Sequence, residues 1–211
     1  MEITGLIAQK VIEGKGDQLN QLIDKAIEQN IDVNKIMGEG FSVGLDIVGE
    51  KFSKREYFLP DLLVSGMIVQ EGLKKVKLLL AKSGAKPKAI VIAGTVLGDM
   101  HDIGKKMVCM MLEGAGFKVI DVGIDVSAEK YINAGGKNNA DIIIMSALLS
   151  TTRLNMEGII KKIRVSELSN IKIIVGGASV TQDFADSIAA DGYAPDAGLA
   201  VKKVKQLLDI S

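Results

Sequence analysis

From residue 89 onward, short apolar runs alternate with longer segments of helical spacing, and this alternation limits the possible folds more than any other feature of the chain. The apolar runs predict strands at residues 89–95, 118–122, 141–145, 171–175 and 192–194. Helices are expected at residues 105–114, 128–138, 153–168, 183–189 and 197–208. Regular alternation of this kind is typical of a parallel sheet with helices on both faces. Five strands favour the flavodoxin-like order, a Rossmann-like arrangement whose ligand crevice lies between the first and third strands.

The N-terminal part of the chain has a different pattern, with apolar residues at three- and four-residue spacing throughout. This spacing predicts helices at residues 3–12, 17–29, 32–52 and 60–82. Helices of this length joined by short loops favour a small antiparallel four-helix bundle. We therefore expect a helical domain over residues 1–83, a small polar linker over 84–88, and an α/β domain over 89–211.

Composition narrows the classes of partner. Lys plus Arg and Asp plus Glu number 26 each, so the chain has no basic excess with which to neutralise nucleic-acid phosphates. The single cysteine, Cys109, gives no disulfide framework. The N-terminus lacks the pattern of a signal peptide, and no apolar stretch approaches the length of a membrane span. We expect a cytoplasmic protein with neither nucleic acid nor membrane as a partner.

The only histidine, His101, follows the first predicted strand in a loop that leads into a helix. Open α/β sheets bind their ligands at this end of the strands. Asp99, two residues earlier, is placed to hold one ring nitrogen, as carboxylates do for metal-bound histidines. A lone loop histidine is also commonly a plain solvated residue, and a protein-only zinc site needs about four ligands. If His101 binds a metal, the other ligands must come with a cofactor.

Two further loops are expected at the same edge of the sheet. A polar segment, residues 146–152, follows the third predicted strand, and the fourth strand ends in Gly176-Gly177. Glycine allows a ligand or another backbone to approach closely, because no side chain intrudes. Each feature alone is common. Their gathering at one edge strengthens the prediction of a ligand site there.

The loops after the first, third and fourth predicted strands resemble, in order and spacing, the three-part signature of cobalamin-binding domains: Asp99-x-His101-x-x-Gly104, Ser146-x-Leu148 and Gly176-Gly177. In the N-terminal half, residues 48–52 and 56–63 look like the helical cap of corrinoid proteins from methyltransferase systems. The likeness covers nearly the whole chain. It is strongest to the small stand-alone corrinoid proteins that serve methylamine, methanol, betaine or aryl-ether methyltransferases.

This resemblance implies a cobalamin or other corrinoid bound base-off/His-on, in which His101 replaces the cofactor's own lower base as the axial ligand of cobalt. It also implies a relay in which Asp99 accepts a hydrogen bond from the other ring nitrogen and Ser146 extends the chain, with no further catalytic residue. The detached nucleotide tail would pass between the loops. The cofactor-binding residues that the resemblance implies are Asp99, Met100, His101, Asp102, Ile103, Gly104, Ser146, Leu148, Thr151, Gly176, Gly177, Tyr193 and Pro195.

The function that the resemblance implies is that of a methyl carrier, cycling between cobalt(I) and methylcobalt(III) in one-carbon metabolism such as methanogenesis or acetogenesis. A substrate-specific methyltransferase would load the methyl group, a second methyltransferase would remove it, and a reductive activase would be a further partner. The chain would not be a catalyst on its own. The helical domain would shield the methyl group, and its candidate lid residues are Val48, Phe52, Leu62 and Met67.

Some alternatives stay open at this point. The glycines at positions 38, 40, 44 and 49 fit either tight helix packing or close approach to a cofactor or partner. A cobalamin-dependent sensor or regulator is the main alternative function, although the chain has no tryptophan and no basic excess. A response-regulator receiver would need an aspartate where Met145-Ser146 stands, and a nicotinamide-binding domain would need a Gly-x-Gly-x-x-Gly turn after the first strand.

Overall fold

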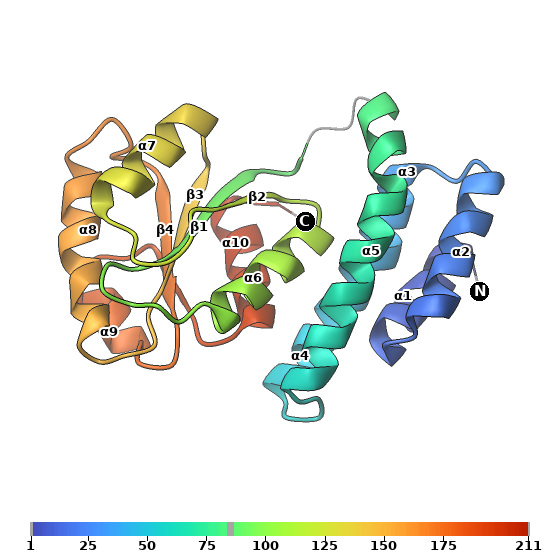
Figure 1. Cartoon of the computed structure of the whole chain (residues 1–211), viewed down its shortest axis with the longest axis horizontal. Helices are drawn as coiled ribbons and strands as arrows, with labels where there is room; N and C mark the ends of the chain where they lie inside the picture. The colour runs from blue at the N-terminus through green and yellow to red at the C-terminus, as the bar shows by residue number, and fades with distance from the viewer. Residues whose placement is uncertain (1, 84–86, 211) are drawn as a thin grey trace. The chain divides into compact units, whose positions relative to one another are not determined.

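The computed structural model describes residues 2–83 and 87–210 (Figure 1). The chain divides into two compact units, one of Met1–Pro87 with Met110–Gly116 and one of Lys88–Cys109 with Phe117–Ser211. Residues 84–86 of the predicted linker lie outside the described residues. The exact domain boundaries and the linker therefore stay a prediction.

The N-terminal unit is helical, as predicted. Its elements are α1 (Ile3–Glu13), α2 (Gly16–Glu28), α3 (Val33–Lys35), the π-helical η1 (Ile36–Ser42), α4 (Val43–Ser53) and α5 (Leu59–Ser83). The helix predicted over residues 32–52 is one helical run that η1 divides, and Asp32 caps its start by accepting a hydrogen bond from the Asn34 N–H at 2.9 Å. None of the described helices is both long and apolar enough to cross a membrane.

Close packing between α1 and the η1–α4 run explains two of the four glycines noted in the sequence. A Cβ atom added at Gly44 would lie 2.7 Å from the Cβ of Val11, and one added at Gly40 would lie 2.8 Å from a methyl group of Ile7. Both positions therefore need glycine for helix packing. A Cβ atom at Gly38 would meet no atom within 4 Å, so packing gives no reason for glycine there.

Two of the four candidate lid residues, Val48 and Leu62, are buried in this structure. Which side chains cover a cofactor stays a prediction. Met67 is exposed, and so is Phe58, just before α5.

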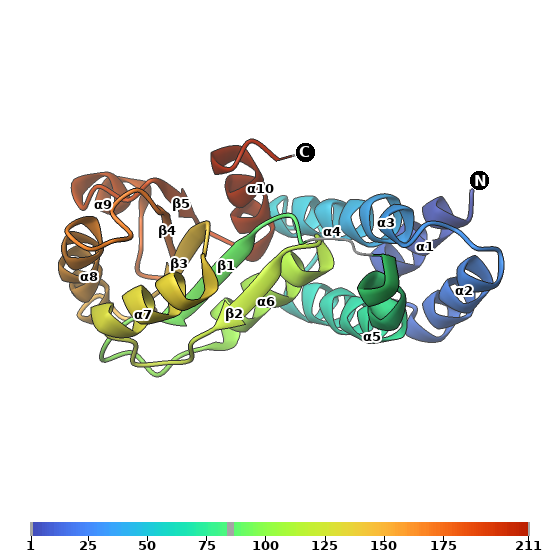
Figure 2. The same cartoon turned by 90° about the horizontal axis from the view of Figure 1, so that it is seen from above.

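The second unit is a five-stranded parallel sheet in the order β2-β1-β3-β4-β5, which confirms the predicted flavodoxin-like topology. The strands are β1 (Ile90–Thr95), β2 (Lys118–Asp121), β3 (Ile142–Ser146), β4 (Lys172–Gly176) and β5 (Gly192–Ala194). The helices are α6 (Ile103–Gly114), α7 (Ala128–Asn138), α8 (Asn155–Arg164), α9 (Gln182–Ser187) and α10 (Ala197–Leu207), with a 3-10 turn, η2 (Thr152–Leu154), before α8. Helices α7, α8 and α9 cover one face, and α6 and α10 cover the other (Figure 1, Figure 2).

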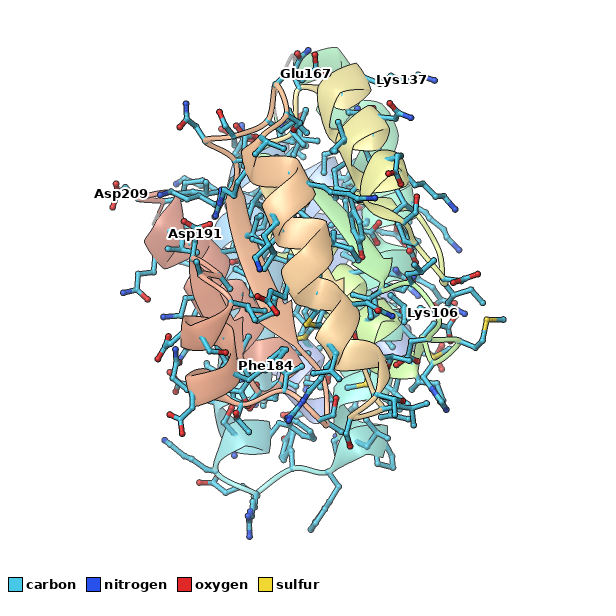
Figure 3. The ribbon with its side chains drawn as sticks, turned by 90° about the vertical axis from the view of Figure 1, so that its left-hand side faces the viewer. Lys106, Lys137, Glu167, Phe184, Asp191 and Asp209 are labelled. Carbon is cyan, nitrogen blue, oxygen red and sulfur yellow. The ribbon has the colours of Figure 1, made fainter. Side chains whose placement is uncertain are left out.

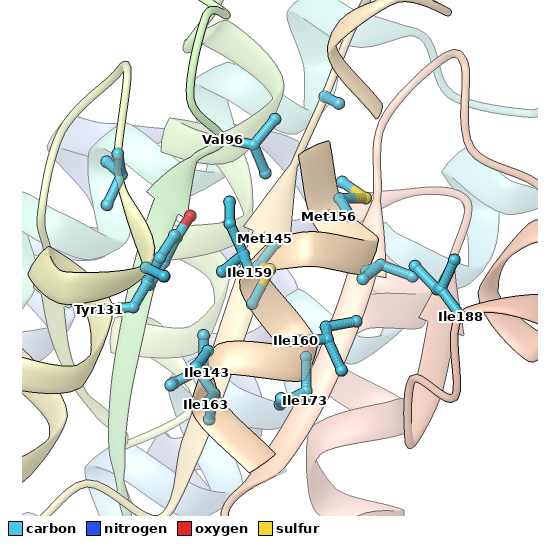
Figure 4. Close-up of a cluster of buried hydrophobic side chains, with 14 of the residues drawn as sticks. Val96, Tyr131, Ile143, Met145, Met156, Ile159, Ile160, Ile163, Ile173 and Ile188 are labelled. Carbon is cyan, nitrogen blue, oxygen red and sulfur yellow. The ribbon is translucent and has the colours of Figure 1, made fainter. Parts of the chain in front are cut away.

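The face under α7, α8 and α9 holds a continuous apolar core (Figure 4). Ile143, Met145 and Ile173 of the central strands pack against Ile160 and Ile163 of α8. β-Branched and other apolar side chains fill both sides of these strands, as is usual in parallel sheets buried between helices. This packing makes the central strands a rigid support for the loops that follow them.

Candidate functional site

Strand register brings the predicted site residues to one edge of the sheet. Thr95 of β1 pairs with Ser146 of β3, Ser146 pairs with Gly176 of β4, and Gly176 pairs with Ala194 of β5. The loops after these strands therefore start from a single row of residues. β1 and β3 are neighbours although β2 lies between them in sequence, so this edge is the topological switch point where such sheets bind ligands.

Asp99 fixes the position of His101 in the loop between β1 and α6. One oxygen of the Asp99 carboxylate, Oδ1, lies 2.8 Å from Nδ1 of His101 and also accepts the His101 backbone N–H at 3.0 Å. The Thr95 hydroxyl donates to the His101 carbonyl oxygen at 3.0 Å. Asp99 is fully buried, whereas 53% of the His101 side chain is exposed. The loop therefore presents an imidazole to the outside from a buried anchor.

The second oxygen of Asp99, Oδ2, is held by the loop after β3. It accepts the Thr152 hydroxyl at 2.6 Å and the backbone N–H groups of Leu148 and Leu149 at 2.8 Å and 3.3 Å. Burial by itself raises the pKa of Asp99, but the hydrogen bonds from Thr152, His101 and Leu148 outweigh it and hold that pKa well below its usual range. The carboxyl group is therefore ionised at neutral pH.

An ionised Asp99 determines the role of each nitrogen of the imidazole. A carboxylate can only accept hydrogen bonds, so Nδ1 of His101 is the donor in this pair and a neutral ring has its lone pair on Nε2. None of the hydrogen bonds among the described residues uses Nε2. Carboxylates orient metal-binding histidines in this way. The arrangement can thus offer one nitrogen ligand to a metal.

Thr152, rather than Ser146, supplies the hydroxyl that contacts Asp99. Ser146 ends β3, and within the described chain no hydrogen bond joins its hydroxyl to Asp99. The loop turns back through η2, which places the Thr152 side chain in a buried position against the carboxylate. In this structure the hydroxyl beside Asp99 thus comes from Thr152, and the role of Ser146 in the relay stays a prediction. The run of hydroxyl residues from Ser150 to Thr152 was the available signal for Thr152. Thr151, which the resemblance implies as a cofactor-binding residue, is exposed.

The three signature glycines have different surroundings. A Cβ atom at Gly177 would lie 2.1 Å from the Ala147 carbonyl oxygen, and one at Gly176 would lie 2.6 Å from the Ala194 carbonyl oxygen. Contact between backbones explains both positions without a ligand. A Cβ atom at Gly104 would meet nothing within 4 Å. Packing within the protein gives no reason for glycine at Gly104, so this position is open to a ligand that approaches closely.

Exposed apolar side chains flank the histidine. Met100 and Ile103, on either side of it, are 65% and 66% exposed, and Leu148 is 42% exposed. Large exposed apolar side chains grouped around polar residues mark binding surfaces. The described residues contain no group of three or more His, Cys, Asp or Glu side chains that would hold a metal ion. One nitrogen donor, an apolar surround and an open Gly104 fit a large apolar ring that carries its own metal.

The other predicted cofactor-binding residues lie close to these loops or on β5. Asp102 forms an ion pair with Lys106 at 2.6 Å, one turn along α6. Tyr193 pairs with Val175 in the sheet and packs against the apolar core, whereas Pro195 is exposed at the end of β5. The structure does not bring Tyr193 or Pro195 into hydrogen-bond contact with Asp99 or His101 among the bonds it describes.

Arg153 is a further residue that the sequence did not suggest. Its Nη1 donates to the Ser179 carbonyl oxygen at 2.5 Å, and its guanidinium group lies 4.8 Å from the ring centroid of Phe184, which is labelled in Figure 3. The Ser179 hydroxyl donates in turn to the Leu149 carbonyl oxygen at 3.0 Å. These contacts tie the loop after β3 to the loop after β4, beside the hydrogen bonds to Asp99.

Two family models match this chain, both described as a B12 binding domain. One covers residues 89–202, which hold the sheet, and the other covers residues 6–77 of the helical unit. Among solved structures, a cobalamin-binding protein from Desulfitobacterium hafniense DCB-2 has a TM-score of 0.84 at 27% identity, covering 99% of this chain and 98% of the other. A chain of the methanol:cobalamin methyltransferase complex from Methanosarcina barkeri has a TM-score of 0.78 at 30% identity, covering 99% and 80%.

Curated relatives match along the full length of both chains. A corrinoid protein of Desulfitobacterium hafniense (strain Y51) is 35% identical over 99% of this chain and 98% of its own. Dimethylamine corrinoid protein 1 of Methanosarcina acetivorans is 36% identical over 98% of each chain. With both units matched and the Asp99–His101 pair in place, the chain belongs to the family of B12-binding corrinoid proteins.

Proposed function

We propose that this chain binds a corrinoid with His101 as the lower axial ligand of cobalt, and carries a methyl group on that cobalt from one methyltransferase to another. The observation that carries the proposal is the buried, ionised Asp99. It holds Nδ1 of His101 and leaves the lone pair of Nε2 free to bind a metal. Membership of the corrinoid protein family supports the identity of the ligand.

When bound, the corrinoid supplies a cobalt atom that accepts a methyl group and gives it up again. The protein's part is to bind, orient and tune. Asp99 keeps the imidazole in one orientation, and its negative charge makes the ring a stronger electron-pair donor to a metal. Thr152 holds the Asp99 carboxylate in place through its hydroxyl group.

The apolar surface and the open glycine agree with this cofactor. Met100, Ile103 and Leu148 would offer apolar contacts to a corrinoid held by His101. Gly104 would allow part of that corrinoid to approach the backbone closely. In the helical unit, Phe58 and Met67 are exposed apolar side chains.

The partners follow from what the relatives are named for. One relative is a dimethylamine corrinoid protein, and one structural neighbour is part of a methanol:cobalamin methyltransferase complex. We propose that a substrate-specific methyltransferase loads this chain, that a second methyltransferase unloads it, and that a reductive activase restores its reduced cobalt. The geometry of His101 and Asp99 is independent of which methylated substrate the first partner uses.

The test exploits the fact that His101 is the only histidine. Growth with [15N]histidine labels this one imidazole, and the protein is then loaded with hydroxocobalamin and reduced to the cobalt(II) state. In the electron paramagnetic resonance spectrum, axial 14N splits each cobalt line into three and axial 15N splits it into two. We expect the pattern to change from three lines to two on labelling, and to disappear in H101A.

Retention of the three-line pattern in labelled protein would show that the corrinoid's own base binds the cobalt, and would overturn the assignment of His101. Absence of bound corrinoid in wild-type protein would overturn the proposal as a whole. Transfer of the methyl group is tested separately, by adding methylated substrates with candidate methyltransferases and following the absorption spectrum of the bound corrinoid.

A further inference from the structure

Asp125, in the loop between β2 and α7, has an unusual backbone conformation next to the His101 loop. Its φ angle is 52°, in the left-handed region that aspartate tolerates better than most residues. The following residue holds it there, because the Val126 N–H donates to the Thr95 carbonyl oxygen at 3.0 Å and Val126 forms a bridge with Val96. The loop is thus fastened to the end of β1.

From this position Asp125 forms hydrogen bonds with two consecutive residues of the His101 loop, Gly98 and Asp99. Its carboxylate Oδ1 accepts the Gly98 N–H at 2.7 Å, and its own N–H donates to the Asp99 carbonyl oxygen at 3.1 Å. Gly98 itself has a φ angle of 81°, within a tight turn closed by a hydrogen bond from the Asp99 N–H to the Val96 carbonyl oxygen. Asp125 therefore fixes the backbone that carries Asp99.

Asp99 is consequently held from two sides. β2 and β3 lie on opposite sides of β1 in the sheet, so their loops flank the loop after β1. The loop after β3 holds the Asp99 carboxylate through Thr152 and Leu148, and the loop after β2 holds the Asp99 main chain through Asp125. Both sets of hydrogen bonds act on the residue whose Oδ1 contacts Nδ1 of His101.

We infer that Asp125 is a positioning residue for His101, acting through the backbone of Asp99 to set the direction in which Nε2 meets a bound metal. This inference rests on the proposed function, since it assigns a role to Asp125 in holding the axial ligand. Asp125 is exposed and does not contact His101 itself in the described hydrogen bonds, so its effect is indirect.

Asp141, directly before β3, provides a matched control because it also contacts the backbone of β1. Its carboxylate Oδ2 accepts the Ile90 N–H at 2.7 Å, at the opposite end of β1, and it is exposed like Asp125. Substituting glycine at either position removes one carboxylate-to-backbone hydrogen bond of equal length. Glycine also adopts a φ angle near 52° without strain, so the variant at position 125 is expected to fold.

The experiment compares D125G, D125N and D141G as full-length protein loaded with hydroxocobalamin and reduced to cobalt(II). Electron paramagnetic resonance with [15N]histidine gives the ratio of His-bound to His-free cobalt in the bound pool. We expect this ratio to fall in D125G by about two- to tenfold, the effect of one net hydrogen bond. D125N keeps an acceptor oxygen and should restore the ratio, and D141G should match wild type. Urea unfolding of the cofactor-free forms should show no larger loss of stability in D125G than in D141G, because glycine suits the left-handed φ angle at position 125.

A wild-type ratio in D125G would overturn the role of Asp125 while leaving His101 as the ligand. An equal fall in D125G and D141G would also overturn it, because general loosening of β1 would then explain the effect. If wild-type protein itself shows no His-bound cobalt, the proposed function fails first, and the two failures are therefore distinguishable.

Discussion

Thr152 shows how much one buried hydroxyl contributes to this site. The Thr152 hydroxyl donates to the fully buried Asp99 carboxylate. Removing this hydroxyl leaves Oδ2 of Asp99 without one of its hydrogen-bond donors. We expect T152V, which keeps the shape of the side chain, to lower the free energy of unfolding of the cofactor-free protein by about 1–3 kcal/mol. T152S should retain most of the wild-type stability. Urea unfolding followed by circular dichroism measures both, and a stable T152V would contradict the assignment.

The sequence located Asp99 and His101 because their spacing and their place after a strand are local features. It could not locate Thr152 in the same way. Ser146 stands at the end of β3, where a simple extension of the strand would place a hydroxyl beside the ligand loop. The turn through η2 brings Thr152 there instead, and that turn depends on tertiary contacts such as Arg153 with Ser179. Asp125 was missed for the same reason, because its contacts come from a different loop.

In the η1–α4 run, helix packing requires glycine at some positions but not at others. A side chain at Gly44 would clash with Val11 and with the Ala8 carbonyl oxygen at 3.0 Å, which is backbone and cannot yield easily. We expect G44A to destabilise the helical unit by about 1–3 kcal/mol. G38A has open space, so the helical propensity of alanine should make it neutral or stabilising by up to about 1 kcal/mol. Urea unfolding of the two variants tests the contrast, and equal effects would contradict it.

The predicted strands and helices agree with the structure to within a residue or two at most ends, because apolar periodicity and turn residues act locally. Helix α7 and strand β5 have the predicted limits. The helix predicted over 153–168 ends earlier, at Arg164, and begins as the 3-10 turn η2. The π-helical geometry of η1 has no signature in the apolar spacing.

For the chain as a unit, corrinoid binding should appear as added stability. A ligand that binds only the folded state, present at about 100 times its dissociation constant, raises the free energy of unfolding by about 2.7 kcal/mol. We expect hydroxocobalamin to shift the urea midpoint of the wild-type protein upward, and to shift that of H101A less at the same concentration. An unchanged wild-type midpoint at saturating corrinoid would mean that the cofactor does not bind to the native fold.

The hydrogen bonds that hold Asp99 also determine when the site can form during folding. Leu148 and Thr152 reach Asp99 across 49 and 53 positions of sequence. Contacts this distant form late, because the entropy of closing a long loop must be overcome first. His101 is therefore oriented only once β1 and β3 have paired, and a growing chain offers cobalt an imidazole with no fixed direction. We therefore expect a shortage of corrinoid to delay loading of the protein rather than its folding.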